Sequence, residues 1–591
     1  MKKRLLLFGL ILTATCALSG CEFLLPSGSN QYTYKPTTSS DSSANQGSSS
    51  NQGTTSSHGG QFSSSKASSG QSASQSSSSS SQSAPPAGDL TAKKASYNYK
   101  HYVDNNVSAM SSTPCVGAGH LLVIPVWFTD SDNFISKSSR DNIRSDIETA
   151  YFGSNSDTGW RSVKTYYEQE SHGALTLTGK VSSWYECGKS YMNYANDNGS
   201  VTATRNLVTT ATNWYFERNG SDSRTNYDKD HDGYLDGVML IYAAPDSQVL
   251  EGSSYSYGSN LWAYCYWVQN SSLKSVSSPG PNVFFWASYD FMYSKGTKAL
   301  DRTGYASQFG NGDTSHCKVD AHTYIHEMGH VFGLDDYYDY SDNEYRPAGR
   351  FSMQDYNVGG HDPYSVYALG WGKAYIPSAT TNIDLKPFQD SGEMILLSPS
   401  FNSDNSPFDE YLLLEYYTPT GLNEFDTNYK YSGGYPNGTK EYGIRLWHVD
   451  ARLIYPTGIN QAGDDYTYSF TSSANPTATN AGAVAKGVNH AMTNTYDDGK
   501  DETQGYLSSL GSGYYNYNLL QLIRNNTSAN YRPKDDFSSS SLFKTGDTFT
   551  METYRAQFVR SGKLNSNKSL GFSFTVNAID LNRASITVTK L

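Results

Sequence analysis

The chain has 591 residues, of which 37% are hydrophobic and 17% charged, and its net charge at pH 7 is −12. Acidic and basic residues are scattered along the chain rather than gathered in blocks, which argues against a nucleic acid as its partner. The part that can fold is too long for one hydrophobic core, so we expect two or more domains.

The first twenty residues have the pattern of a secretory signal peptide. Met1 to Arg4 is positively charged, and Leu5 to Leu12 is an apolar run too short to span a membrane permanently. Leu18 to Cys21 resembles the lipobox at which bacterial lipoproteins are cut and lipidated. We expect Cys21 to carry a lipid anchor at the outer face of the cell membrane. The alternative is an ordinary cleaved signal with an incidental cysteine.

Residues 21–93 are predicted to form a tether. From Ser39 to Gly88 the chain is almost wholly Ser, Gly, Gln, Asn and Ala, and such a segment cannot bury enough surface to offset its ordering entropy. We expect a catalytic domain at 94–373 and a β-rich region at 374–591. Four cysteines lie beyond the tether, and an exported chain can oxidise them into two disulfides by any of three pairings, with free buried thiols as the alternative. They are Cys115, Cys187, Cys265 and Cys317.

An acidic loop lies at residues 226–237, which read NYDKDHDGYLDG. Gly233 occupies the sharp turn of a calcium-binding pattern, but position twelve is Met239 instead of the bidentate glutamate of an EF-hand. We expect the loop to bind Ca²⁺ without forming an EF-hand, and an acidic solvent-exposed turn is the alternative. The expected ligands, at positions one, three, five and nine, are Asp228, Asp230, Asp232 and Asp236.

Residues 321–339 read AHTYIHEMGHVFGLDDYYD and contain the motif HExxH at His326, Glu327 and His330. Residues four apart share one face of a helix, so both imidazoles can reach one cation, with Glu327 within reach of a water on it. The helix is favoured by an apolar face, and Asp320 is its candidate N-cap. The apolar face comprises Ala321, Ile325, Met328 and Phe332. The spacing predicts a zinc site with Glu327 as general base.

A third ligand is expected just after this helix. Gly333 can end the helix in a left-handed conformation, which turns the chain back so that Asp336 reaches the metal. Asp339 is the next candidate, and in the alternative these aspartates only cap or solvate the loop. His322, one turn before His326, is predicted to be a packing or second-shell residue, because a catalytic zinc keeps its fourth position for water.

With these motifs, the sequence resembles the immune inhibitor A family of secreted bacterial metallopeptidases, which are metzincin-like and have the pattern HExxHxxGxxD. The stretch HEMGHVFGLDDYYD reproduces that pattern and the following Tyr-Asp pair, except that Asp335 stands where proline is usual. This departure leaves Asp335 or Asp336 as the aspartate that reaches the metal. Arg350 to Met353 resembles the turn that places a methionine beneath the metal, which implies a structural role for Met353.

The resemblance extends to several distant segments and implies an α+β, zincin-like catalytic domain. Leu121 to Trp127 is a buried-strand run, residues 361–371 resemble the segment that closes the domain, and residues 411–415 and 443–450 resemble paired strands after it. The last of these gives His448 a structural role. Farther on, alternating apolar residues such as Phe572 and Phe574 predict a β-rich, β-sandwich-like C-terminal region.

The sequence therefore predicts a membrane-anchored zinc endopeptidase that hydrolyses peptide bonds of extracellular proteins. Glu327 would take the proton of the attacking water, and Tyr356, near the methionine turn, is the expected oxyanion stabiliser. The alternative is a catalytically idle surface adhesin or glycan-binding lipoprotein on a zincin scaffold. The presence of Glu327 argues against this alternative, because a binding protein has no need of a general base between two metal-binding histidines.

Overall fold

The computed structural model describes residues 90–95, 111–195, 201–293, 319–340, 344–402, 405–429, 435–459, 466–471, 489–490, 492–495 and 517–591. The predicted signal peptide, Cys21 and almost all of the predicted tether lie outside these residues. None of the helices within these ranges has both the length and the apolar character needed to cross a bilayer.

The first sheet has the strand order β2-β1-β4-β6-β5, and the short strand β3 also pairs with β1. Strands β2, β1, β4 and β6 are parallel, whereas β5 is antiparallel to β6. Every residue of β4, and β1 from Leu121 onward, is buried, as is typical of parallel strands covered on both faces. The strands are β1 (Gly117–Trp127), β2 (Leu175–Val181), β3 (Tyr185–Glu186), β4 (Val238–Tyr242), β5 (Tyr264–Trp267) and β6 (Val283–Ser288).

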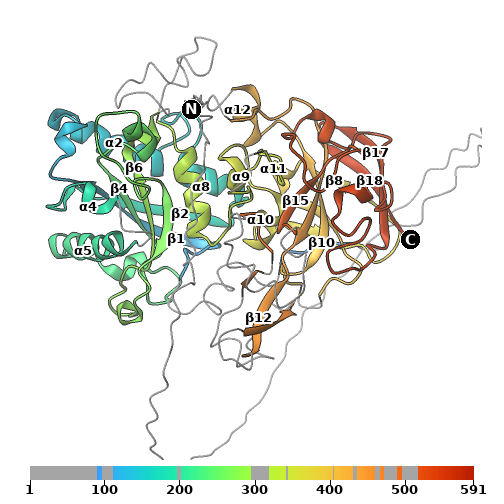
Figure 1. Ribbon diagram of the computed structural model, residues 1–591, viewed down its shortest axis with the longest axis horizontal. Helices are drawn as coiled ribbons and strands as arrows, with labels where there is room; N and C mark the ends of the chain where they lie inside the picture. Colours follow the sequence, from blue (N-terminus) through green and yellow to red (C-terminus); the bar gives the residue numbers. More distant parts are fainter. Residues whose placement is uncertain are drawn as a thin grey trace, which may run out of the picture. The chain divides into compact units, whose positions relative to one another are not determined.

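Helices cover both faces of this sheet. Helices α2 (Arg140–Phe152) and α3 (Val163–Glu170) contact β2, α5 (Thr202–Arg218) contacts β4, and α8 (His322–Val331) contacts β5, β6 and α3. The chain passes from β1 to β2 in one direction and back past β1 to β4 in the other, so right-handed crossovers put α5 on the face opposite α2 and α3. Figure 1 shows α5 and α8 on opposite sides of the sheet.

The C-terminal region is built mainly from two further sheets. The first has the order β15-β11-β10-β9-β7, in which only β7 and β9 are parallel, and the second has the antiparallel order β16-β17-β18-β8. The strands of the first are β7 (Lys373–Tyr375), β9 (Glu393–Leu397), β10 (Glu410–Tyr417), β11 (Gly443–Asp450) and β15 (Leu520–Ile523). Those of the second are β8 (Thr381–Leu385), β16 (Thr548–Phe549), β17 (Phe572–Asp580) and β18 (Arg583–Lys590).

The remaining elements are short. Strands β12 (Leu453–Ile459), β13 (Tyr466–Thr471) and β14 (Asn489–His490) form a small antiparallel sheet of their own. The short helices are α4 (Met192–Ala195), α6 (Ser247–Glu251), α9 (Met353–Tyr356), α10 (Pro363–Ala368), α11 (Phe388–Ser391) and α12 (Asn423–Asn428). The combination of helices and sheets and the β-rich C-terminal region that the sequence predicted are confirmed, while the zincin-like and β-sandwich-like folds remain predictions.

Strand β10 joins two hydrophobic cores because all eight of its residues are buried. Side chains alternate between the faces of a strand, so Tyr411 and Leu413 enter the large core around the first sheet, while Leu412 and Leu414 enter a second core. That second core also contains Phe574 and other side chains of the antiparallel sheet. The large core therefore continues past residue 373, and the domain boundary expected there remains a prediction.

The expectation of two disulfides is wrong. Two bridges among four cysteines require that at least one joins two of Cys115, Cys187 and Cys265, and no such bridge is formed. Cys317 lies outside the described residues. Cys115 and Cys265 are buried, which is usual for thiols that act as small apolar side chains.

A buried arginine joins the C-terminal sheet to the segment before α9. The Nε of Arg445 on β11 lies 2.6 Å from Oε1 of Glu415 on β10, and both side chains are almost fully buried. Its Nη1 donates a hydrogen bond of 3.1 Å to the carbonyl of Phe351, two residues before Met353. The guanidinium also lies 5.2 Å from the ring centre of Phe537. Arg445 thus connects β10, β11 and the chain that leads into α9.

We expect Arg445→Met to lower the free energy of unfolding by about 3–5 kcal/mol, because it leaves the Glu415 carboxylate in an apolar interior without its cation. Denaturant unfolding followed by tryptophan fluorescence measures this. The matched control is Arg583→Met, which removes a pair with Asp384 whose side chains are 60% and 50% exposed and should cost less than about 1 kcal/mol. Equal losses in the two variants would contradict the assignment.

Candidate metal centre

Helix α8 presents the two histidines of HExxH on one face. It runs from His322 to Val331, and Ala321 is its N-cap. The predicted cap, Asp320, lies one residue earlier, and its carboxylate accepts a hydrogen bond of 3.1 Å from the first helical N–H, that of His322. His326 and His330 are fully buried. The predicted helix is confirmed, with its N-cap displaced by one residue.

Backbone carbonyls fix the orientation of both imidazoles. Nδ1 of His326 lies 2.6 Å from the carbonyl of Met353, and Nδ1 of His330 lies 2.8 Å from the carbonyl of Leu334. A carbonyl oxygen can only accept, so each Nδ1 carries the hydrogen and each neutral ring keeps a lone pair on Nε2. The two Nε2 atoms are 3.1 Å apart. Both rings are therefore oriented as metal ligands usually are.

Asp336 completes the group. Gly333 has a φ of +102°, so the chain turns there as predicted and brings Asp336 back toward the helix. Its Oδ1 lies 3.0 Å from Nε2 of His326 and 3.3 Å from Nε2 of His330. A tetrahedral zinc ion about 2.0–2.1 Å from each ligand would hold the ligand atoms roughly 3.3–3.4 Å apart. His326, His330 and Asp336 form a group that can hold a metal ion, and neither Asp335 nor Asp339 belongs to it.

The electrostatics of this group suit a cation. Burial raises the pKa of Asp336, but His330 and His326 outweigh it and leave that pKa below its usual range. Burial lowers the pKa of His330, and the charge of Asp336 reverses the effect, with a net rise. Oδ1 of Asp336 accepts no hydrogen bond although it is buried. An ionised buried oxygen that faces two imidazole nitrogens fits a site for a divalent ion.

Glu327 is fully buried beside this group. On β5, the pKa of the Cys265 thiol is raised mainly by burial and further by the negative charge of Glu327. The same two causes raise the pKa of Tyr151 on α2. Glu327 is thus buried on the same helix as the two histidines, and its charge raises the pKa of side chains on β5 and α2.

Helix α9 packs against α8 and contacts one of the two histidines. Met353, the first residue of α9, is fully buried, and its carbonyl oxygen contacts Nδ1 of His326. The expected role of its side chain, packing beneath the metal, remains a prediction. The next residue, Gln354, packs so closely against Gly329 that a Cβ at position 329 would overlap the amide of Gln354. A residue larger than glycine between Met328 and His330 would therefore force the side-chain amide of Gln354 to move.

His322 belongs to a separate charged cluster and not to the metal-ligand group. Its Nδ1 lies 2.6 Å from Asp320, its Nε2 lies 3.3 Å from Asp426 on α12, and its ring stacks on Trp160 at 4.2 Å. The other carboxylate oxygen of Asp426 accepts a hydrogen bond of 2.7 Å from the backbone of Gly359. The cluster connects the start of α8 to the C-terminal region, so the predicted packing role of His322 is confirmed.

Tyr356 is partly buried at the end of α9. The guanidinium of Arg350 lies 4.7 Å from the centre of its ring, and the rings of Tyr338 and Tyr435 lie at 6.4 and 5.4 Å. These contacts hold the ring, but they do not show that its hydroxyl faces the metal-ligand group. The role of Tyr356 as oxyanion stabiliser remains a prediction.

The acidic loop places three carboxylates together. Asp228, Asp230 and Asp232 form a second group that can hold a metal ion, and Gly233 has the positive φ, +91°, that the turn requires. Asp228 is buried, and its Oδ1 accepts no hydrogen bond. Asp236 is not in this group, and its assignment as a ligand remains a prediction. Its oxygens accept hydrogen bonds of 2.7 and 2.9 Å from the backbones of His120 and Lys229, which order the loop.

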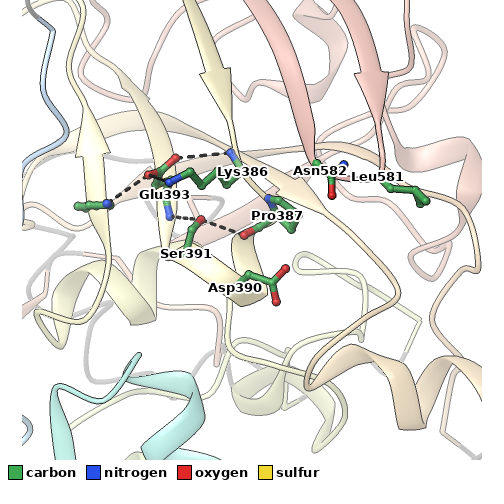
Figure 2. A pocket seen from close by; sticks show the side chains of 8 residues that line it. Lys386, Pro387, Asp390, Ser391, Glu393, Leu581 and Asn582 are labelled. Atoms are coloured by element: carbon green, nitrogen blue, oxygen red, sulfur yellow. Dashed lines mark hydrogen bonds and ion pairs between the residues drawn. The ribbon is translucent and has the colours of Figure 1, made fainter.

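Two other features are separate from these groups. Nε2 of His448 lies 2.9 Å from Glu410, within strands β10 and β11, which agrees with the structural role expected of His448. A surface cavity of about 450 Å³ in the C-terminal region contains Lys373 and Lys386, which lie 3.2 and 3.8 Å from Glu393 (Figure 2). The lysines are thus already paired with an acidic group, and none of the candidate metal ligands lines the cavity.

The sequence did not single out several residues that support the centre. Tyr340 donates a hydrogen bond of 2.8 Å to Oδ2 of Asp336. From the C-terminal region, Asp426 contacts His322 at the start of α8, and Arg445 contacts the carbonyl of Phe351 before α9. Tyr340 lies only four residues after Asp336, so the sequence could have suggested a contact between them. No local pattern in the sequence indicates the contacts of Asp426 and Arg445.

No protein-family model matches the sequence, and no curated protein matches it either.

The charge of His322 gives a prediction about pH. Burial alone would lower its pKa, but Asp320 and then Asp426 outweigh burial and raise the pKa to about 9. Because this value lies above that of the unfolded chain, about 6.5, the added stability is fully present below pH 6.5 and is lost as the pH rises through 9. We expect His322→Gln to remove up to about 3 kcal/mol of stability at pH 6 and far less at pH 10.

Denaturant unfolding of both proteins between pH 6 and pH 10 measures this difference. Identical pH dependence in wild type and His322→Gln would show that the imidazole is not charged in the folded protein.

The acidic loop gives a prediction about calcium. We expect Ca²⁺ to raise the melting temperature, because an ion that binds only the folded state stabilises it by about 2.7 kcal/mol at one hundred times its Kd. Asp228→Asn should abolish this shift, while Asp384→Asn, at an exposed position, should retain it. A melting temperature that does not respond to Ca²⁺ in the wild-type protein would contradict the calcium assignment.

Proposed function

We propose that the protein is a zinc-dependent endopeptidase of metzincin-like fold, similar to the immune inhibitor A family, that hydrolyses extracellular proteins. The observation that carries this proposal is the convergence of two imidazole Nε2 atoms and one carboxylate oxygen within 3.3 Å, with Glu327 beside them. Two histidines and one carboxylate are a known ligand set of catalytic zinc, and they leave a fourth position open. We propose Ca²⁺ as the ion of the acidic loop.

The first sheet supports a peptide as the substrate. In the described part of the chain, β5 is the last strand in the order of the sheet and pairs only with β6, and all four of its residues are buried. An extended peptide can add to the last strand of a sheet through backbone hydrogen bonds. Helix α8 packs against β5 and β6, and Cys265 on β5 feels the charge of Glu327. A peptide along β5 would therefore pass close to the metal centre.

The residues of the centre have separate roles in this proposal. A bound zinc ion supplies a Lewis acid, which polarises a carbonyl group and lowers the pKa of a water molecule toward roughly 7. His326, His330 and Asp336 would hold the ion, and the carbonyls of Met353 and Leu334 hold the two rings. Glu327 accepts the proton of the attacking water and later delivers it to the amine that leaves. We propose that Tyr356 donates to the oxyanion.

We further propose that the enzyme acts at the cell surface. Residues 1–20 would be removed as a signal peptide, Cys21 would carry the lipid, and residues 21–93 would hold the folded part away from the membrane. The substrate would then be a protein outside the cell.

Glu327 distinguishes an enzyme from a binding protein. We expect Glu327→Ala to keep its zinc and to lose roughly two to four orders of magnitude in the rate of peptide cleavage, because the carboxylate moves a proton and holds no metal. His330→Ala should lose both zinc and activity, because it removes a ligand. Metal analysis and digestion of a peptide library measure the two effects separately.

Cleavage by Glu327→Ala at the wild-type rate would contradict the proposed mechanism. If fully zinc-loaded wild-type protein cleaves no peptide in a broad library, the adhesin or glycan-binding alternative replaces the peptidase.

A further inference from the structure

Tyr340 contacts the candidate ligand Asp336 on the side away from the histidines. Its hydroxyl donates a hydrogen bond of 2.8 Å to Oδ2, while Oδ1 lies 3.0 and 3.3 Å from the two Nε2 atoms. The two oxygens of one carboxylate thus have different partners. Within the described chain, Tyr340 supplies the one hydroxyl group that is bonded to Asp336.

The position of Tyr340 follows from the turn after α8. The chain reverses at Gly333 and brings residues 336–340 past the histidines. The ring of Tyr340 packs against that of Tyr338 at 5.3 Å, and Tyr338 meets Tyr356 of α9 at 6.4 Å. These ring contacts restrain the side chain of Tyr340, so its hydroxyl is oriented before any ion binds.

The hydrogen bond has a direct consequence for metal binding. A carboxylate can bind a cation through one oxygen or through both, and an oxygen that accepts a hydrogen bond has less electron density to offer a second ligand bond. With Oδ2 engaged, Asp336 would bind through Oδ1 alone. A third ligand that occupies one position keeps the remaining position of a tetrahedral centre open for water. Groups that orient a ligand in this way typically contribute 10- to 100-fold to metal affinity.

We propose that Tyr340 is a positioning residue that holds Asp336 as a monodentate ligand of the zinc ion. The inference rests on the proposed metal centre and adds a residue that the motif HExxHxxGxxD does not contain. Tyr340 acts through Asp336 and does not touch the ion.

The test compares Tyr340→Phe with Tyr338→Phe in the otherwise unchanged protein. Zn²⁺ affinity is measured by competition with a chromophoric chelator, and the coordination of Co²⁺ in place of zinc is measured by visible absorption. We expect Tyr340→Phe to bind Zn²⁺ roughly 10- to 100-fold more weakly. Its Co²⁺ absorption should weaken, because the released Oδ2 can join the ion and raise its coordination number. Tyr338→Phe removes a hydroxyl from the neighbouring ring and should match wild type in both measurements.

Two further measurements make each outcome decisive. The metal-free melting temperatures of Tyr340→Phe and wild type should agree, which separates a loss of ligand orientation from a loss of folding. If Tyr340→Phe matches wild type in Zn²⁺ affinity and in the Co²⁺ spectrum while Asp336→Ala loses the metal, the role of Tyr340 is wrong and the centre stands. If Asp336→Ala and His330→Ala both bind Zn²⁺ as tightly as wild type, the proposed centre itself is wrong.

Discussion

The structure depends on keeping three candidate ligand atoms within 3.3 Å of one another in the buried interior of the protein. Without a cation this arrangement is costly, because a buried carboxylate loses its hydration and two imidazole lone pairs face it. The protein offsets this cost with a hydrogen bond to each candidate ligand, at an atom that does not face the other two. The carbonyl of Met353 holds His326, the carbonyl of Leu334 holds His330, and Tyr340 holds Asp336. Each of these contacts comes from chain that follows α8.

The segment that supplies these contacts is itself held by the C-terminal region. Arg445 binds the carbonyl of Phe351 just before α9, and Asp426 binds the backbone of Gly359 just after it while also reaching His322 at the start of α8. Strand β10 buries one face in the core that contains α8 and the other in the core of the antiparallel sheet. The C-terminal region therefore supports the candidate metal centre.

Local signals in the sequence predicted the parts of the site that lie close together in the chain. The helical spacing of His326 and His330 and the left-handed Gly333 predicted an aspartate beside the histidines, with Asp336 favoured and Asp335 left open, because geometry over eleven residues is set by the helix and one turn. The hydrogen bonds of Asp236 were not predicted, because spacing alone cannot distinguish a carboxylate that binds an ion from one that binds backbone N–H groups. Arg445 and Asp426 could not be predicted, since their contacts depend on how distant strands pack and no short pattern records that.

The contact between Gly329 and Gln354 restricts how this centre can change over time or by engineering. A glycine inside a helix costs about 1 kcal/mol of helix stability relative to alanine. At position 329 the missing side chain lets the amide of Gln354 on α9 pack closely against α8. A larger residue at 329 is compatible with the same backbone only if the side chain of Gln354 moves away or becomes smaller. The two positions are therefore coupled. Transfer of the HExxH helix alone into another scaffold would leave behind half of that pair.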